Sequence, residues 1–154
     1  MRAILSTIFI CFVVAACARV SLASDVARKF VEFNDINCED ESAHLDNFAV
    51  ELQNNPESTG YIIFYGGRTF RRRLPRFGES AARAARIEKY LITSRGISAD
   101  RIVMLDGGYR ETWQAELWIV PRGAVTPKPT PTLRSQEIKF RKGKARTRDY
   151  ECEI

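Results

Sequence analysis

An arginine-rich segment is the most distinctive chemical feature of this sequence. Residues 65–80 read YGGRTFRRRLPRFGES, and five arginines fall within nine positions: Arg68, Arg71, Arg72, Arg73 and Arg76. Guanidinium groups bind carboxylates and phosphates through paired hydrogen bonds. The segment is therefore a candidate ligand-binding surface that favours anionic groups. The alternative is a solvated loop whose charges are balanced by acidic residues elsewhere, because runs of charge usually form exposed surface.

Catalytic and metal-binding chemistry has little support in the sequence. His44 is the one histidine, and no CxxC or HxxxH spacing is present that would hold zinc. The sequence also lacks the GxSxG nucleophile motif and the GxxxxGK[ST] phosphate loop. We therefore expect a binding protein that is not an enzyme and that uses no metal and no cofactor.

The first 23 residues have the layout of a secretory signal. Arg2 precedes an apolar stretch from Ala3 to about Ala18, and Ser21-Leu22-Ala23 forms a cleavage site before Ser24. The apolar stretch is shorter than the roughly 20 residues that cross a bilayer, so we expect no transmembrane segment in the mature chain. These features predict a periplasmic or secreted protein, for which nucleic acid is not an expected partner.

A lipoprotein signal competes with this interpretation. The residues Val14-Ala15-Ala16-Cys17 resemble a lipobox, in which Cys17 would be lipidated and become the new N-terminus. The mature protein would then be lipid-anchored to the envelope through Cys17.

The mature chain retains two cysteines, Cys38 and Cys152. In an oxidising compartment an isolated pair of this kind is a disulfide candidate with only one possible connectivity. We therefore predict a Cys38–Cys152 disulfide that ties the end of the chain to the start of the first predicted helix.

Composition divides the mature chain into three parts. Residues 24–121 carry the apolar patterns of one domain, residues 122–133 form a Pro/Thr-rich linker, and residues 134–154 form a basic tail. From Ser24 to Val120 there are 13 basic and 15 acidic residues, whereas from Pro121 onward there are 9 basic and 4 acidic residues. The positive net charge therefore belongs to the tail, and the arginine segment is offset within the domain by an acidic N-terminal third.

The apolar periodicity predicts an α+β fold. Amphipathic helices are expected within 38–56 and 78–96, and strands are expected at 31–36, 60–67, 101–108 and 112–121. The order β-α-β-α-β-β predicts a two-layer sandwich, in which two helices cover one face of a mixed four-stranded sheet. We expect the last two strands to pair as a hairpin through Gly107 and Gly108, and a short basic extension to follow the domain.

This order of elements resembles the OmpA-like periplasmic domain family over residues 31–120. The second helix and the segment after it carry the most specific part of the resemblance. The family reads approximately L-S-x-x-R-A, V-x-x-Y-L and G-(I/V)-x-x-x-R-(I/V) there, and the residues in that register are Ser80, Arg83, Ala84, Tyr90, Leu91, Gly96, Ile97, Arg101 and Ile102.

The resemblance implies a ligand cleft that has changed its charge. Family members hold the diaminopimelate side chain of peptidoglycan between a helix Arg and the Asp of a G-H-T-D motif. Arg83 stands at the Arg position, but Tyr65-Gly66-Gly67-Arg68 replaces the motif, so that Arg68 stands at the position of the Asp. A ligand ammonium would meet a guanidinium there, at a cost on the order of 1 kcal/mol. We thus expect a divergent member whose cleft, rimmed by the arginine segment, favours anions. The alternative is a cleft that binds nothing, in which Arg83 pairs with Glu79.

Two functions follow from these features. One is a non-catalytic cell-envelope binding module whose arginine segment and Arg83 contact cell-wall glycan or peptide, or an anionic envelope polymer. The other is a structural or interaction protein whose basic tail docks an acidic protein partner or a membrane surface, while the ligand cleft is degenerate.

Overall fold

The computed structural model describes residues 26–150. The predicted signal peptide, Cys17 and Cys152 lie outside the described residues. Within residues 26–150, no helix is both long and apolar enough to cross a membrane.

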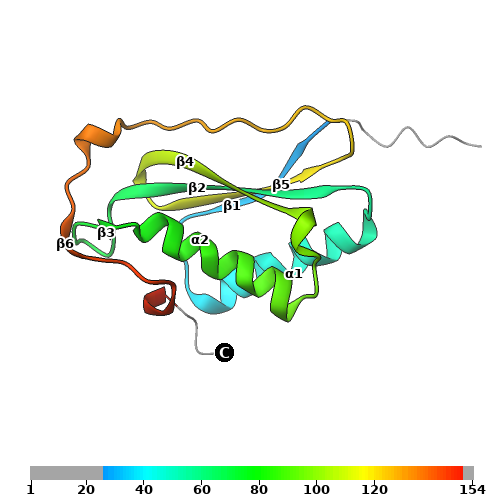
Figure 1. The fold of residues 1–154 in the computed structure, drawn as a ribbon, viewed down its shortest axis with the longest axis horizontal. Coiled ribbons are helices and arrows are strands. Elements are labelled where there is room, and N and C mark those ends of the chain that lie inside the picture. Colours follow the sequence, from blue (N-terminus) through cyan, green and yellow to red (C-terminus); the bar gives the residue numbers. More distant parts are fainter. Residues whose placement is uncertain (1–25, 151–154) are drawn as a thin grey trace, which may run out of the picture.

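A mixed four-stranded sheet with two helices on one face forms the body of the protein (Figure 1). The sheet has the order β1-β5-β2-β4, with bounds Arg28–Phe33, Gln114–Val120, Thr59–Thr69 and Ile102–Thr112. β2 and β4 run parallel, and β5 runs antiparallel to both β1 and β2. The predicted α+β fold is therefore confirmed.

Both helices are amphipathic and bury one side against the sheet. Helix α1 (Cys38–Asn54) begins at Asn37, whose side chain accepts a hydrogen bond from the Asp40 amide over 2.8 Å. This is a typical N-terminal cap, and acidic residues in the first turn add to it. Helix α2 (Glu79–Lys89) continues into a π-helical turn (Tyr90–Ser94). The helices contribute these fully or almost fully buried apolar side chains to the core: Leu45, Phe48, Ala49, Leu52, Ala84, Ile87 and Leu91.

The expected hairpin between the last two strands is wrong. β5 does not pair with β4 but lies between β1 and β2. The side chains of Ala115 and Leu117 are fully buried, and a central position gives the backbone of this strand hydrogen-bond partners on both sides. The apolar side chains of β5 are therefore better buried at the centre of the sheet than they would be in a hairpin beside β4 at its edge.

Gly107 and Gly108 have a different role from the expected turn. They lie inside β4, at an irregularity where the register of β2 with β4 shifts between Phe64 and Gly66. Gly108 has a φ of +80°, which favours glycine. A Cβ atom on Gly107 would lie 2.4 Å from the ring of Tyr65, so glycine is needed there to let that ring pack against the strand.

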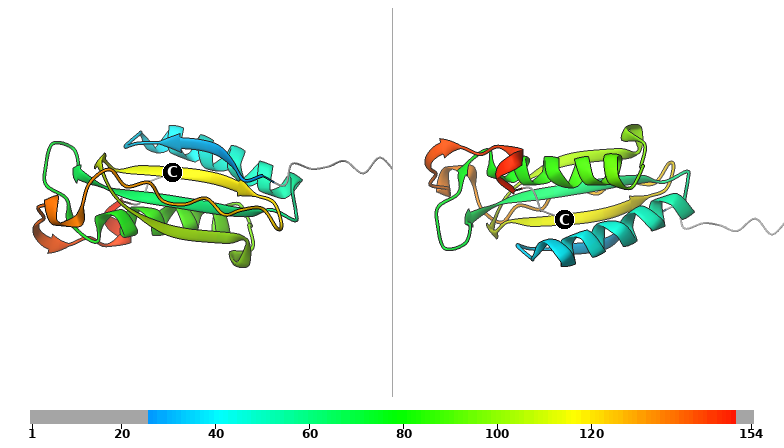
Figure 2. Two further views of the ribbon diagram at one scale, coloured as in Figure 1. Left: turned by 90° about the horizontal axis from the view of Figure 1, so that it is seen from above. Right: turned by 90° about the horizontal axis from the view of Figure 1, so that it is seen from below.

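The chain beyond the sheet returns along the molecule, and we call residues 122–150 the C-terminal strap. Its first part crosses the face of the sheet opposite the helices (Figures 1 and 2). The Thr130 amide donates to the Tyr65 hydroxyl over 3.1 Å, and Arg110 donates to the Thr130 hydroxyl over 2.7 Å. Its second part forms strand β6 (Arg141–Lys144), which pairs in parallel with strand β3 (Arg76–Phe77). The strap is thus attached to the domain along its length.

Candidate functional site

Arg83 is a buried cation on the side of α2 that faces the start of α1. Its side chain is only 5% exposed, and its Nη2 atom donates a hydrogen bond to Asp35 Oδ1 over 2.7 Å. Asp35 lies in the loop between β1 and α1. Burial lowers the pKa of Arg83, and the charge of Asp35 opposes this effect. Because an arginine remains protonated in proteins, a positive charge is held beneath the surface here.

Two aromatic rings hold the guanidinium of Arg83 in place. Its central carbon lies 3.9 Å from the ring centre of Trp113 and 4.7 Å from that of Phe70. Cation–π contacts of this kind are worth more when water is excluded. The rings fix the orientation of the fork without using any of its N–H donors.

One nitrogen of this fork is left without a hydrogen bond. Arg83 Nη1 is buried and has no hydrogen-bond partner among the described residues. The side chain borders a hollow of about 180 Å³, whose lining is shared by the β1–α1 loop, the arginine segment, α2 and the end of the strap. The residues that line it are Asp35, Ile36, Cys38, Glu41, Phe70, Arg71, Arg83, Arg86, Asp149 and Tyr150. A buried donor without a partner is costly, so this hollow is the best candidate for a ligand site.

The end of the strap closes one side of the hollow. Asp149 forms an ion pair with Arg76, with 2.8 Å between Oδ2 and Nη1, and the ring of Tyr150 packs edge-on against Phe70. Burial, the charge of Glu79 and a hydrogen bond to Glu79 raise the pKa of Tyr150 to about 12. A neutral phenol therefore covers the site at physiological pH.

The structure separates the five arginines of the predicted site. Arg71 lies at the hollow, with its Nε atom 3.7 Å from Asp35 Oδ2, and Arg76 holds the strap. Arg68 does not line the hollow, and its Nε atom pairs instead with exposed Glu111 over 3.1 Å. Arg72 and Arg73 are exposed and form no ion pair with any residue between 26 and 150.

A tight turn presents the middle of the arginine segment. Phe70 and Arg73 exchange backbone hydrogen bonds of 2.8 and 2.9 Å, so Arg71 and Arg72 form a two-residue turn. Their φ angles are 48° and 63°. Turns with this geometry usually contain Asn-Gly, because a side chain strains the backbone when φ is positive. The strain is concentrated at the rim of the hollow, as is common at functional sites.

Several residues at the hollow and around Arg83 were not identified from the sequence. In the sequence, Asp35 is only one of several acidic residues in the N-terminal third. The partner predicted for Arg83 in an empty cleft is Glu79, whereas the structure pairs Arg83 with Asp35. Arg86 pairs with Glu41, and burial lowers its pKa. Nothing in the sequence marks Trp113 or Tyr150 as a site residue, because an aromatic residue is equally compatible with a core strand or with a tail.

The predicted disulfide remains a prediction, since Cys152 lies outside the described residues. The course of the strap supports it. Tyr150, two residues before Cys152, lines the same hollow as Cys38 at the start of α1. The end of the strap and the start of α1 therefore border the same hollow.

Metal-binding side chains are not grouped in the described part of the chain. Residues 26–150 contain no cluster of three or more histidines, cysteines or carboxylates suited to a metal ion. His44 stacks on the ring of Phe33, with 5.6 Å between the ring centres.

Comparison with models of known protein families and with curated proteins finds no match for the sequence. The hollow at Arg83 must therefore be interpreted from its own chemistry.

Proposed function

We propose that this protein is a non-catalytic binding module of the cell envelope, and that Arg83 receives an anionic group of a cell-wall component. The single observation that carries the proposal is the buried Nη1 atom of Arg83, which has no partner among the described residues and belongs to a side chain at the edge of a hollow. A carboxylate would satisfy this donor, and a hydrogen bond to a charged group contributes about 1.5–3 kcal/mol.

The size of the hollow limits the ligand. Sites for small molecules usually measure about 300–1,000 Å³, whereas this hollow measures about 180 Å³. It would admit a side chain or a terminal carboxylate rather than a whole sugar. The stem peptide of peptidoglycan offers such carboxylates, and the resemblance to the OmpA-like family supports this choice of ligand.

The charges around the hollow favour an anion over a zwitterion. Three carboxylates line the hollow, Asp35, Glu41 and Asp149, and each of them already forms an ion pair with an arginine. These carboxylates are occupied, so a ligand ammonium would find few acceptors. The proposal therefore predicts stronger binding of carboxylates than of amino acids with a free ammonium nearby.

Calorimetry with muropeptides and pull-down with purified sacculi test the proposal. Arg83→Gln removes the charge and the fork but keeps a long polar side chain, and Arg68→Gln is the matched control outside the hollow. We expect Arg83→Gln to weaken binding by at least tenfold, and Arg68→Gln to leave binding within twofold of the wild type. Equal binding by wild type and Arg83→Gln, with both proteins folded by circular dichroism, would refute the proposal.

A further inference from the structure

The end of the molecule that carries β3 and β6 has an unusual combination of exposed aromatic rings and cations. Phe77 in β3 is 63% exposed, and Phe140, just before β6, is 38% exposed. Their rings pack edge-on with 5.7 Å between the ring centres, and Phe140 also contacts Tyr109 at 6.3 Å. Leu74, three residues before Phe77, is a third exposed apolar side chain. We call these three residues, Leu74, Phe77 and Phe140, the apolar tip.

Cations without acidic partners adjoin the apolar tip. From Ile138 to Arg148 the strap contains six basic residues and no acidic residue. Pairing of β3 with β6 brings this segment to the tip, because Phe77 lies opposite Lys144 and the Arg141 amide donates to the Pro75 carbonyl over 2.9 Å. Several cations of this end are exposed and form no ion pair with any residue from 26 to 150: Arg72, Arg73, Lys139, Lys142 and Lys144.

We infer that this end of the protein docks on an anionic lipid surface. Lysine and arginine side chains are attracted to acidic headgroups, while exposed aromatic rings enter the boundary between headgroups and acyl chains. A soluble polyanion would account for the cations but would leave the exposed rings without a role. The rings are held by their contacts with each other and with Tyr109, so they are presented as a fixed edge rather than on a mobile tail.

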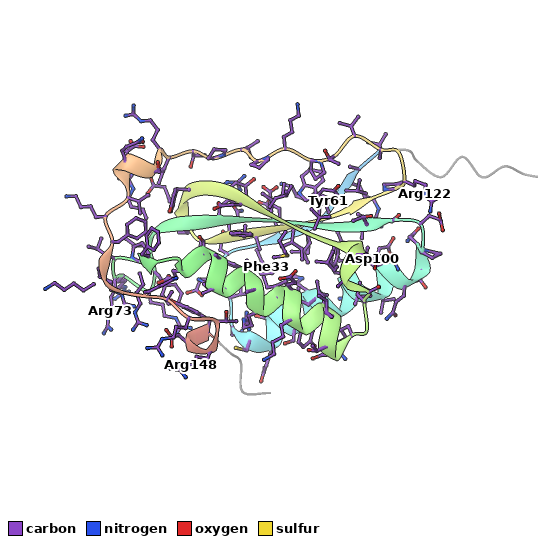
Figure 3. All side chains as sticks on the ribbon, in the orientation of Figure 1. Phe33, Tyr61, Arg73, Asp100, Arg122 and Arg148 are labelled. Atoms are coloured by element: carbon purple, nitrogen blue, oxygen red, sulfur yellow. The ribbon has the colours of Figure 1, made fainter. Side chains whose placement is uncertain are left out.

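The placement of the tip within the molecule agrees with this role. Figure 1 shows β3 and β6 together at one extremity, and Figure 3 shows Arg73 at that extremity, while Arg122 lies at the opposite end. Contact of this extremity with a membrane would leave the helices and the far end of the sheet free. The docking surface is distinct from the hollow at Arg83, and the inference does not depend on the proposed function.

Vesicle sedimentation with the full mature chain tests the inference. We expect the wild type to bind vesicles containing phosphatidylglycerol at moderate salt, and to bind vesicles of pure phosphatidylcholine much more weakly. Reversal of two cations, Lys142→Glu with Lys144→Glu, should lower the partition coefficient by at least about 25-fold, because each cation near an anionic surface contributes about fivefold. The matched control is Arg122→Glu with Lys128→Glu, which changes the net charge equally and should retain most of the binding.

The aromatic contribution needs a separate measurement. Phe77→Ser should lower binding to anionic vesicles by about tenfold, whereas Val125→Ser, at a residue that is 82% exposed in the strap, should have no effect. A Phe77→Trp variant should show a blue shift of its emission when anionic vesicles are added. If Phe77→Ser binds these vesicles as well as the wild type while soluble polyphosphate competes fully, the surface binds polyanions and the inference fails. Equal loss of binding in the two double charge variants would also overturn it.

Discussion

Arg83 and Asp35 form a partly buried ion pair between α2 and the loop that precedes α1. The pair joins two elements that are separated by 48 residues in sequence, with 2.7 Å between Nη2 and Oδ1. It uses Nη2 of the guanidinium, whereas Nη1 is buried and has no hydrogen-bond partner among residues 26–150. The same side chain thus contributes to stability and to the candidate site, and the two contributions can be separated experimentally.

Removing the charge of Asp35 should destabilise the protein. Breaking a fully buried pair costs about 3–5 kcal/mol, because the remaining charge is left uncompensated. Asp35 is 31% exposed, so we expect Asp35→Asn to lower the free energy of unfolding by about 2 kcal/mol. Urea denaturation measures the change. The control is Glu111→Gln, which breaks the exposed pair with Arg68 and should cost less than about 0.5 kcal/mol.

Relieving the strained turn should increase stability and weaken binding. Replacement of Arg71-Arg72 by Asn-Gly suits the positive φ angles at both positions and should raise the free energy of unfolding by about 1 kcal/mol. The same change removes a cation from the rim of the hollow, so anion binding should weaken. A variant with Lys at both positions keeps the charge and the strain, and it should match the wild type in both measurements. Lower thermal stability of the Asn-Gly variant would contradict this interpretation of the turn.

Gly107 should not tolerate a larger side chain. A Cβ atom there would meet the ring of Tyr65 at 2.4 Å, within a strand pair that cannot easily move. We expect Gly107→Ala to cost about 2–3 kcal/mol through overpacking. In a double-mutant cycle with Tyr65→Ala the two effects should not add, because removing the ring removes the clash. Additive effects would show that the cost comes from elsewhere.

Tyr150 should no longer close the hollow at strongly alkaline pH. The pKa of this phenol is raised to about 12 from an ordinary value of 10.0, because burial and Glu79 disfavour the phenolate. The contact therefore stabilises the protein below about pH 10 and is lost as pH rises toward 12. The difference between ultraviolet titrations of wild type and Tyr150→Phe should show one phenol that ionises near pH 12. A difference centred near pH 10 would mean that Tyr150 is not held at the site.

Reduction should loosen the strap if the predicted disulfide is present. A bridge between Cys38 and Cys152 would close a loop of more than one hundred residues. In the chain-entropy model such a bridge contributes up to about 4–5 kcal/mol. Peptide mapping without reductant should recover the two cysteines in one linked fragment. Free thiols at both positions in protein from an oxidising compartment would disprove the pairing.

Local patterns in the sequence were enough to predict the helices, the strands and the α+β class of the fold. Leu45, Phe48 and Leu52 recur at helical spacing, and Ala115, Leu117 and Ile119 alternate along a strand. These periodicities depend only on the local geometry of the backbone, so they can be recognised without knowledge of the rest of the chain. For the same reason the strand before the arginine segment and the helix after it could be recognised, although Arg68 lies within β2 and Arg76 within β3.

Contacts between residues that are distant in sequence could not be predicted in this way, because they depend on how the elements pack. The place of β5 between β1 and β2 depends on competition among strand edges, and local sequence does not encode it. Asp35 and Tyr150 reach Arg83 from opposite ends of the chain, and Arg68, which the sequence placed in the same site, pairs with Glu111 instead. Burial makes these contacts important for stability. A guanidinium that is excluded from water must be stabilised by the carboxylates and aromatic rings that the fold places around it.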